Sequence, residues 1–319
     1  MPTQLQPFSA GACLSGGLYS LFGWCVSSEI PLPELRCWSG PDRPADVLIR
    51  TGQVPPLNGD TRQVGPLITF TETALRFDMP GVAVYRVDGG SAVTVEPAPG
   101  VLPESPEIRL FLFGTVLAVL CFRRGLLPLH ASAVEVDGQA LLLTGPSGIG
   151  KSTLAAVLVA RGHPLLSDDL CALDVSRPDA PLILPCTPHL KLWQESASHL
   201  NIRTDGLLPV RDGLEKFRIP VAATAEALTP GAAVLLSRTT RAEQAGLRRL
   251  HGAEALNHEM VHRPRLGIAL GYQPRMLLGL AALARTAPVF QLDRTDTLED
   301  LPELADAVTG LIRKQHPDG

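Results

Sequence analysis

The chain has few of the features that mark proteins that bind nucleic acids or span membranes. Its net charge of −4 over 319 residues argues against the basic excess by which nucleic-acid-binding proteins neutralise phosphates. Its longest apolar run, Leu110 to Phe122, has 13 residues, whereas a helix that crosses a bilayer needs about 20. We therefore expect no nucleic-acid partner and no membrane partner, and we expect this run to form a buried helix.

Cysteine motifs and a secretory signal are also missing. The six cysteines include no C-x-x-C pair and have no histidine beside them at metal-ligand spacing. The first basic residue is Arg36, so the beginning of the chain has no charged region of the kind that opens a signal peptide. We expect six reduced thiols, no disulfide framework and a cytoplasmic protein.

The length and composition fit a globular protein of two domains. Short β-rich pieces separated by Pro, Gly and Asp occupy residues 18–96, and a proline-rich stretch follows at residues 96–107. We predict a β-rich N-terminal domain over residues 1–105 that helps to select the substrate. An α/β domain is predicted over residues 106–319, and the pair Asp137-Gly138 predicts a hairpin within it.

The most informative stretch is GPSGIGKST, which starts at Gly145, follows an apolar run and precedes a helical pattern. It matches the phosphate-binding loop G-x-x-x-x-G-K-[ST], in which glycines let backbone N–H groups point at phosphate oxygens. The lysine adds positive charge for the β- and γ-phosphates, and the serine hydroxyl can ligate Mg²⁺. We expect ATP and Mg²⁺ as ligands, bound by Gly145, Ser147, Gly148, Ile149, Gly150, Lys151, Ser152 and Thr153.

Motifs of two other nucleotide-binding classes are absent. Transporter-type ATPases have an LSGGQ signature after the loop, but here LSGG occurs at residues 14–17, before the loop, and lacks the glutamine. The chain also has no N-K-x-D motif, by which GTPases read guanine.

An acidic pair, Asp168-Asp169, follows Lys151 after one predicted helix and within a second predicted strand. We expect that strand to be a parallel neighbour of the strand before the loop, so that their carboxyl ends meet. Adjacent carboxylates on a strand point to opposite faces. At a strand end, one could face Mg²⁺ while the other accepts a proton from the attacking hydroxyl, which is the division that phosphoryl transfer requires.

Four segments together resemble the HPr serine kinase/phosphorylase family, whose core also resembles phosphoenolpyruvate carboxykinases. They are LHASAV (residues 129–134), the hairpin, the loop, and RGHPLLSDD (residues 161–169). PCTPHLKLW and EKFRIP extend the resemblance to HPr-kinase-related kinases of ribosomal-peptide pathways, including kinases of lasso-peptide precursors. The resemblance implies a P-loop kinase that phosphorylates a serine of a small protein or precursor peptide, and it leaves a homo-oligomer open.

The resemblance also implies roles for individual residues. Lys151 and Ser152 would be the phosphate and Mg²⁺ ligands, Asp169 the base, Asp168 its metal-facing neighbour, and His130 a partner that positions the pair. The two aspartates could exchange these roles. Thr153 departs from the family pattern, in which glutamate usually follows the serine of the loop.

Lysine is scarce, with four residues against 24 arginines. Lys216, in a predicted polar loop beside Glu215, could reach a transferring phosphate or form a surface ion pair. Lys191 precedes Trp193 in a predicted strand, and we interpret it as structural. Two other functions remain open from the sequence: a kinase of a free small-molecule hydroxyl, and a sensor or assembly factor that binds ATP without transferring its phosphate.

Overall fold

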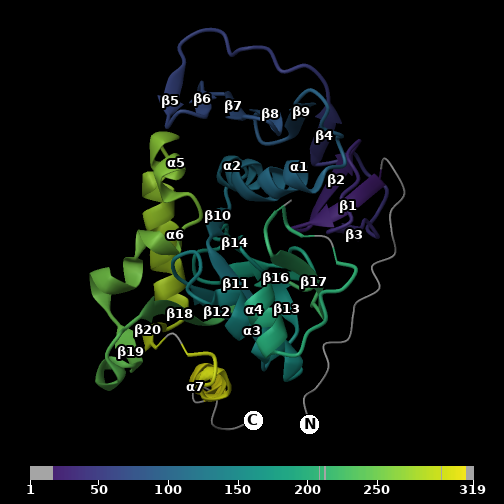
Figure 1. Ribbon diagram of the computed structural model, residues 1–319. Coiled ribbons are helices and arrows are strands. Elements are labelled where there is room, and N and C mark those ends of the chain that lie inside the picture. Colours follow the sequence, from purple (N-terminus) through teal and green to yellow (C-terminus); the bar gives the residue numbers. More distant parts are fainter. Residues whose placement is uncertain (1–16, 208, 212, 296, 314–319) are drawn as a thin grey trace.

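The N-terminal region of the computed structural model is a nine-stranded sheet, at the top of Figure 1. The model describes residues 17–207, 209–211, 213–295 and 297–313. The strand order is β3-β1-β2-β4-β9-β8-β7-β6-β5, and β4 pairs in parallel with both β2 and β9. The strands are β1 (Gly17–Leu21), β2 (Trp24–Ser28), β3 (Arg36–Cys37), β4 (Val47–Thr51), β5 (Arg62–Val64), β6 (Ile68–Phe70), β7 (Ala74–Met79), β8 (Ala83–Asp88) and β9 (Ala92–Pro97).

The long apolar run forms the predicted buried helical segment. It consists of α1 (Pro106–Phe111), a π-helical turn (Leu112–Val116) and α2 (Leu117–Arg123). Its apolar side chains belong to the same core as those of the nine-stranded sheet. In Figure 1 the segment lies between that sheet and the rest of the protein. The division of the chain into domains at residue 105 stays a prediction.

The second half of the chain is built around a six-stranded sheet with the order β13-β11-β12-β18-β20-β19. Its strands are β11 (Ala131–Val136), β12 (Gln139–Thr144), β13 (Leu165–Ser167), β18 (Pro230–Arg238), β19 (Gly246–Leu250) and β20 (Val289–Arg294). Smaller sheets are formed by β10 (Leu127–Leu129), β14 (Cys171–Asp174) and β15 (Leu182–Leu184), and by β16 (His189–Trp193) with β17 (Lys216–Pro220).

Helices cover both faces of this sheet, because its strands carry apolar side chains on both faces, as β12 does. Its side chains alternate, so Leu141 and Leu143 join one core while Ala140 and Leu142 join the core on the opposite face. Because both faces are buried, residues 140–143 of the strand form an uninterrupted apolar run. The helices are α3 (Lys151–Ala160), α4 (Gln194–His199), α5 (Pro264–Ala269), α6 (Gln273–Thr286) and α7 (Leu301–Arg313). α3 and α7 pack on the first face and α6 on the second.

The acidic pair lies elsewhere than predicted. Asp168 and Asp169 occupy a bend between β13 and β14 rather than a strand, and Asp169 has a φ of 73°. β13 is also not a neighbour of β12, because β11 lies between them and pairs antiparallel with both. Two antiparallel steps give β13 the same direction as β12. The bend therefore still lies at the edge of the sheet from which the phosphate loop leaves.

Three other predictions are corrected. The sequence of residues 253–261 predicts one helix, but the segment forms two 3₁₀ turns, Gly252–Leu256 and His258–Met260, and the Asn257 side chain caps the second turn by accepting from the Glu259 N–H. Lys216 begins β17 instead of lying in a loop.

Cysteine usage is the third correction. Cys37 is disulfide-bonded, whereas Cys25, Cys121, Cys171 and Cys186 are free thiols. Cys13 lies outside the described residues.

Within the described part of the chain, none of the helices combines the length and apolar character needed to cross a bilayer.

A buried ionic cluster joins the N-terminal region to the second half of the chain. Glu34 accepts from Arg109 Nε at 2.8 Å, and Arg218 of β17 lies 3.4 Å from the same carboxylate oxygen. The side chains of Glu34 and Arg109 are 6% and 7% exposed. Removing one partner of such a cluster leaves uncompensated buried charge.

Glu34→Ala should therefore destabilise the protein strongly. We expect the free energy of unfolding, measured by chemical denaturation, to fall by about 3–5 kcal/mol. Glu254→Ala is the control, because Glu254 forms an exposed pair with Arg248 and should contribute less than about 1 kcal/mol. Equal losses in the two variants would contradict the role assigned to the cluster.

Candidate functional site

The phosphate loop has the backbone geometry that its glycines predict. Gly145, Gly148 and Gly150 have φ angles of 133°, 81° and 103°, which residues with a Cβ rarely adopt. α3 begins at Lys151, within the motif and directly after Gly150, so its N-terminal N–H groups face the same space. The loop residues from Ser147 to Thr153 line one pocket, with a cavity volume of about 230 Å³.

The loop lysine is held by the loop itself. Lys151 Nζ donates to the carbonyl oxygens of Gly145 and Pro146 at 2.8 and 3.0 Å. Burial lowers the pKa of Lys151, and the nearby carboxylates of Asp168 and Asp169 oppose that shift. The ammonium group is therefore held against the backbone of the loop in this structure.

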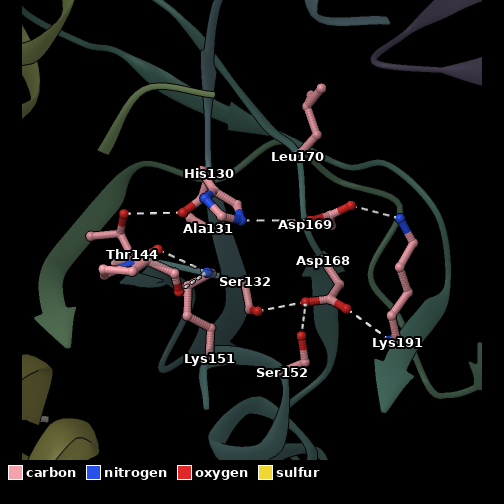
Figure 2. Close-up of polar contacts among 12 residues, drawn as sticks. His130, Ala131, Ser132, Thr144, Lys151, Ser152, Asp168, Asp169, Leu170 and Lys191 are labelled. Carbon is pink, nitrogen blue, oxygen red and sulfur yellow. Dashed lines mark hydrogen bonds and ion pairs between the residues drawn. The ribbon is translucent and has the colours of Figure 1, made fainter. Parts of the chain in front are cut away.

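Asp168 is the junction between three elements of the site (Figure 2). One carboxylate oxygen accepts from the Ser132 hydroxyl of β11 at 2.5 Å and from the Ser152 hydroxyl of α3 at 2.8 Å. The other accepts from the backbone N–H of Lys191 in β16 at 2.8 Å. Asp168 is 5% exposed, so these donors replace the water that its charge would otherwise bind.

Asp169 faces the pocket, in a different direction from Asp168. Its Oδ2 accepts from Lys191 Nζ at 2.7 Å, and its Oδ1 lies 3.6 Å from His130 Nε2. Lys191 holds the pKa of Asp169 far below its usual range, although burial opposes the shift. The left-handed backbone at Asp169 turns the two successive carboxylates toward different partners.

His130 is close to Asp169 but does not form a charge pair with it. Burial lowers the pKa of His130 to about 4, and Lys151 contributes to that shift. The imidazole is therefore neutral near pH 7. Its ring meets that of His262 edge to face, with centroids 5.6 Å apart. His262 is buried, and its Nδ1 has no hydrogen-bond partner among the described residues.

The pocket contains charged residues that the sequence interpretation left out. Lys191, interpreted as structural, contacts Asp169, while Arg238 and Arg294 end β18 and β20 beside the loop. Arg238 donates to the Gly148 carbonyl at 2.9 Å. These arginines could have been identified from their positions at the ends of two strands, because ligands of α/β sheets bind at the carboxyl ends of parallel strands. The charged side chains lining the pocket are Lys151, Lys191, Lys216, Arg238 and Arg294 against Asp169 and Glu195.

Lys216 and Trp193 form another wall of the pocket. Lys216 Nζ lies 5.5 Å from the centroid of the Trp193 ring, and Trp193 is 44% exposed. The predicted phosphate contact of Lys216 stays a prediction. The structure places its side chain in the same pocket as Lys151.

The donor set fits Mg²⁺ bound together with a nucleotide. Among the described residues no group of three His, Cys, Asp or Glu side chains could hold a metal ion by itself. Mg²⁺ is commonly held by one or two protein oxygens plus substrate phosphates. Ser152 gives its hydroxyl proton to Asp168, which leaves its oxygen lone pairs available to a cation.

Sequence comparison finds a family profile that matches this segment. Residues 126–218 match the profile of the HPr Serine kinase C-terminal domain. This range contains the loop, the acidic pair, Lys191 and Lys216. The predicted α/β P-loop core with a β-rich N-terminal region is confirmed, and the resemblance to HPr kinases is confirmed for this part of the chain.

Several related proteins align with the chain over short stretches. The HPr kinase/phosphorylase of Clostridium botulinum (strain Eklund 17B / Type B) is 49% identical over 55 residues, 17% of each chain. That of Nitrosomonas europaea is 40% identical over 77 residues, 24% of each chain. That of Leptospira biflexa is 38% identical over 84 residues, 26% of this chain and 24% of the relative. The alignments span no more than about a quarter of these relatives.

A solved structure, the Hpr(Ser) kinase/phosphatase from Coxiella burnetii, aligns with 60% of this chain and 90% of its own, at 14% identity and a TM-score of 0.33. These likenesses do not extend to the ribosomal-peptide pathways that the sequence interpretation included.

Gly145→Ala and Gly148→Ala should separate a clash from backbone strain. A Cβ on Gly145 would lie 2.6 Å from the Leu236 carbonyl oxygen, whereas a Cβ on Gly148 has no atom within 4 Å. We expect Gly148→Ala to lower the free energy of unfolding by about 1–2 kcal/mol, the cost of a left-handed residue. Gly145→Ala should cost more, because β18 must shift. Denaturant titration measures both, and a smaller loss for Gly145→Ala would contradict this geometry.

Proposed function

We propose that this protein is a kinase that transfers the γ-phosphoryl group of Mg-ATP to a serine hydroxyl of a small protein or ribosomal precursor peptide. The proposal rests on one observation: Asp169, a carboxylate at the pocket surface, lies in the same pocket as Lys151 and Ser152 of the phosphate loop. Phosphoryl transfer to a hydroxyl needs these groups together, since the loop binds the donor and the carboxylate accepts the proton of the acceptor.

Each residue has a distinct role in this proposal. The loop N–H groups and Lys151 bind the phosphates, and Ser152 binds the metal, with Asp168 orienting Ser152 from behind. Mg²⁺ supplies positive charge that spreads the negative charge of the β- and γ-phosphates. Arg238 and Arg294 bond to carbonyl oxygens of the loop and so support its shape.

The reaction makes and breaks one bond at phosphorus. The serine oxygen attacks the γ-phosphorus while the bond from phosphorus to the β–γ bridging oxygen breaks, and ADP leaves. The hydroxyl proton passes to Asp169, the carboxylate at the pocket surface. His130, held neutral, positions Asp169 through its Nε2 side.

A lasso-type precursor peptide is the acceptor that we propose. The support is the resemblance of PCTPHLKLW and EKFRIP to kinases of such pathways, together with Thr153 in place of the glutamate usual in HPr kinases. We further propose that the N-terminal region, residues 1–105, helps to select this acceptor, and that the protein acts in the cytoplasm, where ATP is available.

Lys151→Ala should remove nucleotide binding. The variant lacks the ammonium group that faces the phosphates, so we expect the dissociation constant for Mg-ADP, measured by calorimetry, to rise at least 100-fold, since hydrogen bonds to charged groups contribute about 1.5–3 kcal/mol each. The exposed-residue variant Arg248→Ala should bind as the wild type does. Unchanged Mg-ADP binding in Lys151→Ala would contradict the proposal that this loop binds the phosphates.

Asp169→Asn should bind nucleotide and fail to transfer phosphate. With labelled ATP and candidate precursor peptides, mass spectrometry should find phosphoserine with the wild type and a rate lower by about 10²–10⁴ with the variant, the contribution of a general base. Mg-ADP binding should change less than about threefold. If Asp168→Asn loses phosphate transfer while Asp169→Asn transfers normally, the roles of the two aspartates are exchanged. Labelled free serine would favour the small-molecule kinase, and the absence of any labelled acceptor would favour the sensor.

A further inference from the structure

The strand β16 presents one face to the pocket, and Lys191 lies at its centre. Leu190 and Leu192 are buried in the core beneath α3, so the alternate side chains Lys191 and Trp193 point the other way and line the pocket. Lys191 is thus placed at the pocket by the pleat of a paired strand, because β16 pairs with β17 along its whole length.

Lys191 contacts both aspartates, but with two different groups. Its backbone N–H holds Asp168 and its Nζ, at 2.7 Å, holds Asp169. The backbone contact and the pairing with β17 already anchor the strand. The ammonium group is therefore not required to hold β16 in place, and its function has to be sought in the pocket.

Lysine is an uncommon choice in this chain. Three of its four lysines, Lys151, Lys191 and Lys216, line this pocket, and Lys314 lies outside the described residues. Arg238 and Arg294, the arginines of the pocket, bond to carbonyl oxygens and maintain the loop. A lysine ammonium differs from a guanidinium in being a compact charge on a flexible stem, which can exchange one anionic partner for another.

We propose that Lys191 is a further catalytic residue: it pairs with Asp169 in the absence of nucleotide and contacts the transferring γ-phosphoryl group when Mg-ATP is bound. This inference rests on the proposed kinase function. The exchange does two things at once. It supplies positive charge to the phosphoryl oxygens, and it frees Asp169 Oδ2 to accept the proton of the acceptor hydroxyl as the new oxygen–phosphorus bond forms.

Binding of a transition-state mimic tests this without knowledge of the acceptor. Aluminium fluoride occupies the position of the transferring phosphoryl group beside Mg-ADP, and transition-state mimics bind far more tightly than ground-state ligands. Calorimetry measures the dissociation constant of Mg-ADP with and without aluminium fluoride. The ratio of the two constants reports contacts to the phosphoryl group, whereas a merely structural residue changes both constants equally.

Lys191→Gln is the principal variant, because the amide still donates a hydrogen bond to Asp169. We expect its Mg-ADP constant to stay within about threefold of the wild type and its tightening by aluminium fluoride to fall about 100-fold, as when one donor to the transition state is removed. Lys191→Arg keeps the charge and should recover part of the tightening. Arg248→Gln, an exposed cation in a surface pair, is the matched control.

Two outcomes would overturn the inference: full tightening in Lys191→Gln, or equal weakening of both constants. Thermal unfolding of each variant identifies loss of structure. If Lys191→Gln does not fold, Lys191→Met decides, because it also removes the charge; about 100-fold weaker tightening is expected, and full tightening would overturn the inference. A wild-type protein that does not bind Mg-ADP would instead overturn the proposed function, so the two failures are distinguishable.

Discussion

The arrangement of the site depends on the carboxylate of Asp168. It is buried, and it accepts hydrogen bonds from β11, from the first turn of α3 and from the backbone of β16. A buried charge satisfied by three donors fixes the relative positions of the elements that provide them. The hydroxyl of Ser152, which we propose as the metal ligand, and the strand that presents Lys191 are thereby set against the same bend.

The bend itself separates the work of two adjacent carboxylates. In a regular strand Asp168 and Asp169 would point to opposite faces of a sheet, and one of them would face the core. The left-handed conformation of Asp169 directs its carboxylate to the pocket while Asp168 stays behind Ser152. A non-glycine residue with positive φ costs free energy, and such residues are concentrated at functional sites.

The sequence predicted local features better than contacts between distant segments. The loop, its helix and the hairpin at Asp137-Gly138 depend on residues next to one another in the chain, and the structure has all three. The acidic pair was predicted at the correct sheet edge, but within a strand instead of a bend and beside the wrong neighbouring strand, because an apolar pattern marks a strand without specifying its partner. The contact of Lys191 with Asp169 joins residues 22 positions apart, and nothing in the pattern around PHLKLW specifies it.

The scarcity of lysine has a practical consequence. Reagents that acylate amines usually modify many surface lysines of a protein, which obscures the one in a nucleotide site. Here the described lysines are those of one pocket, and elsewhere in the described chain the positive side-chain charge is provided by arginine, which such reagents do not acylate. An acyl phosphate of a nucleotide would thus find its target amines grouped around the phosphate position, and the pattern of labelled peptides would report which ammonium groups meet the bound phosphates.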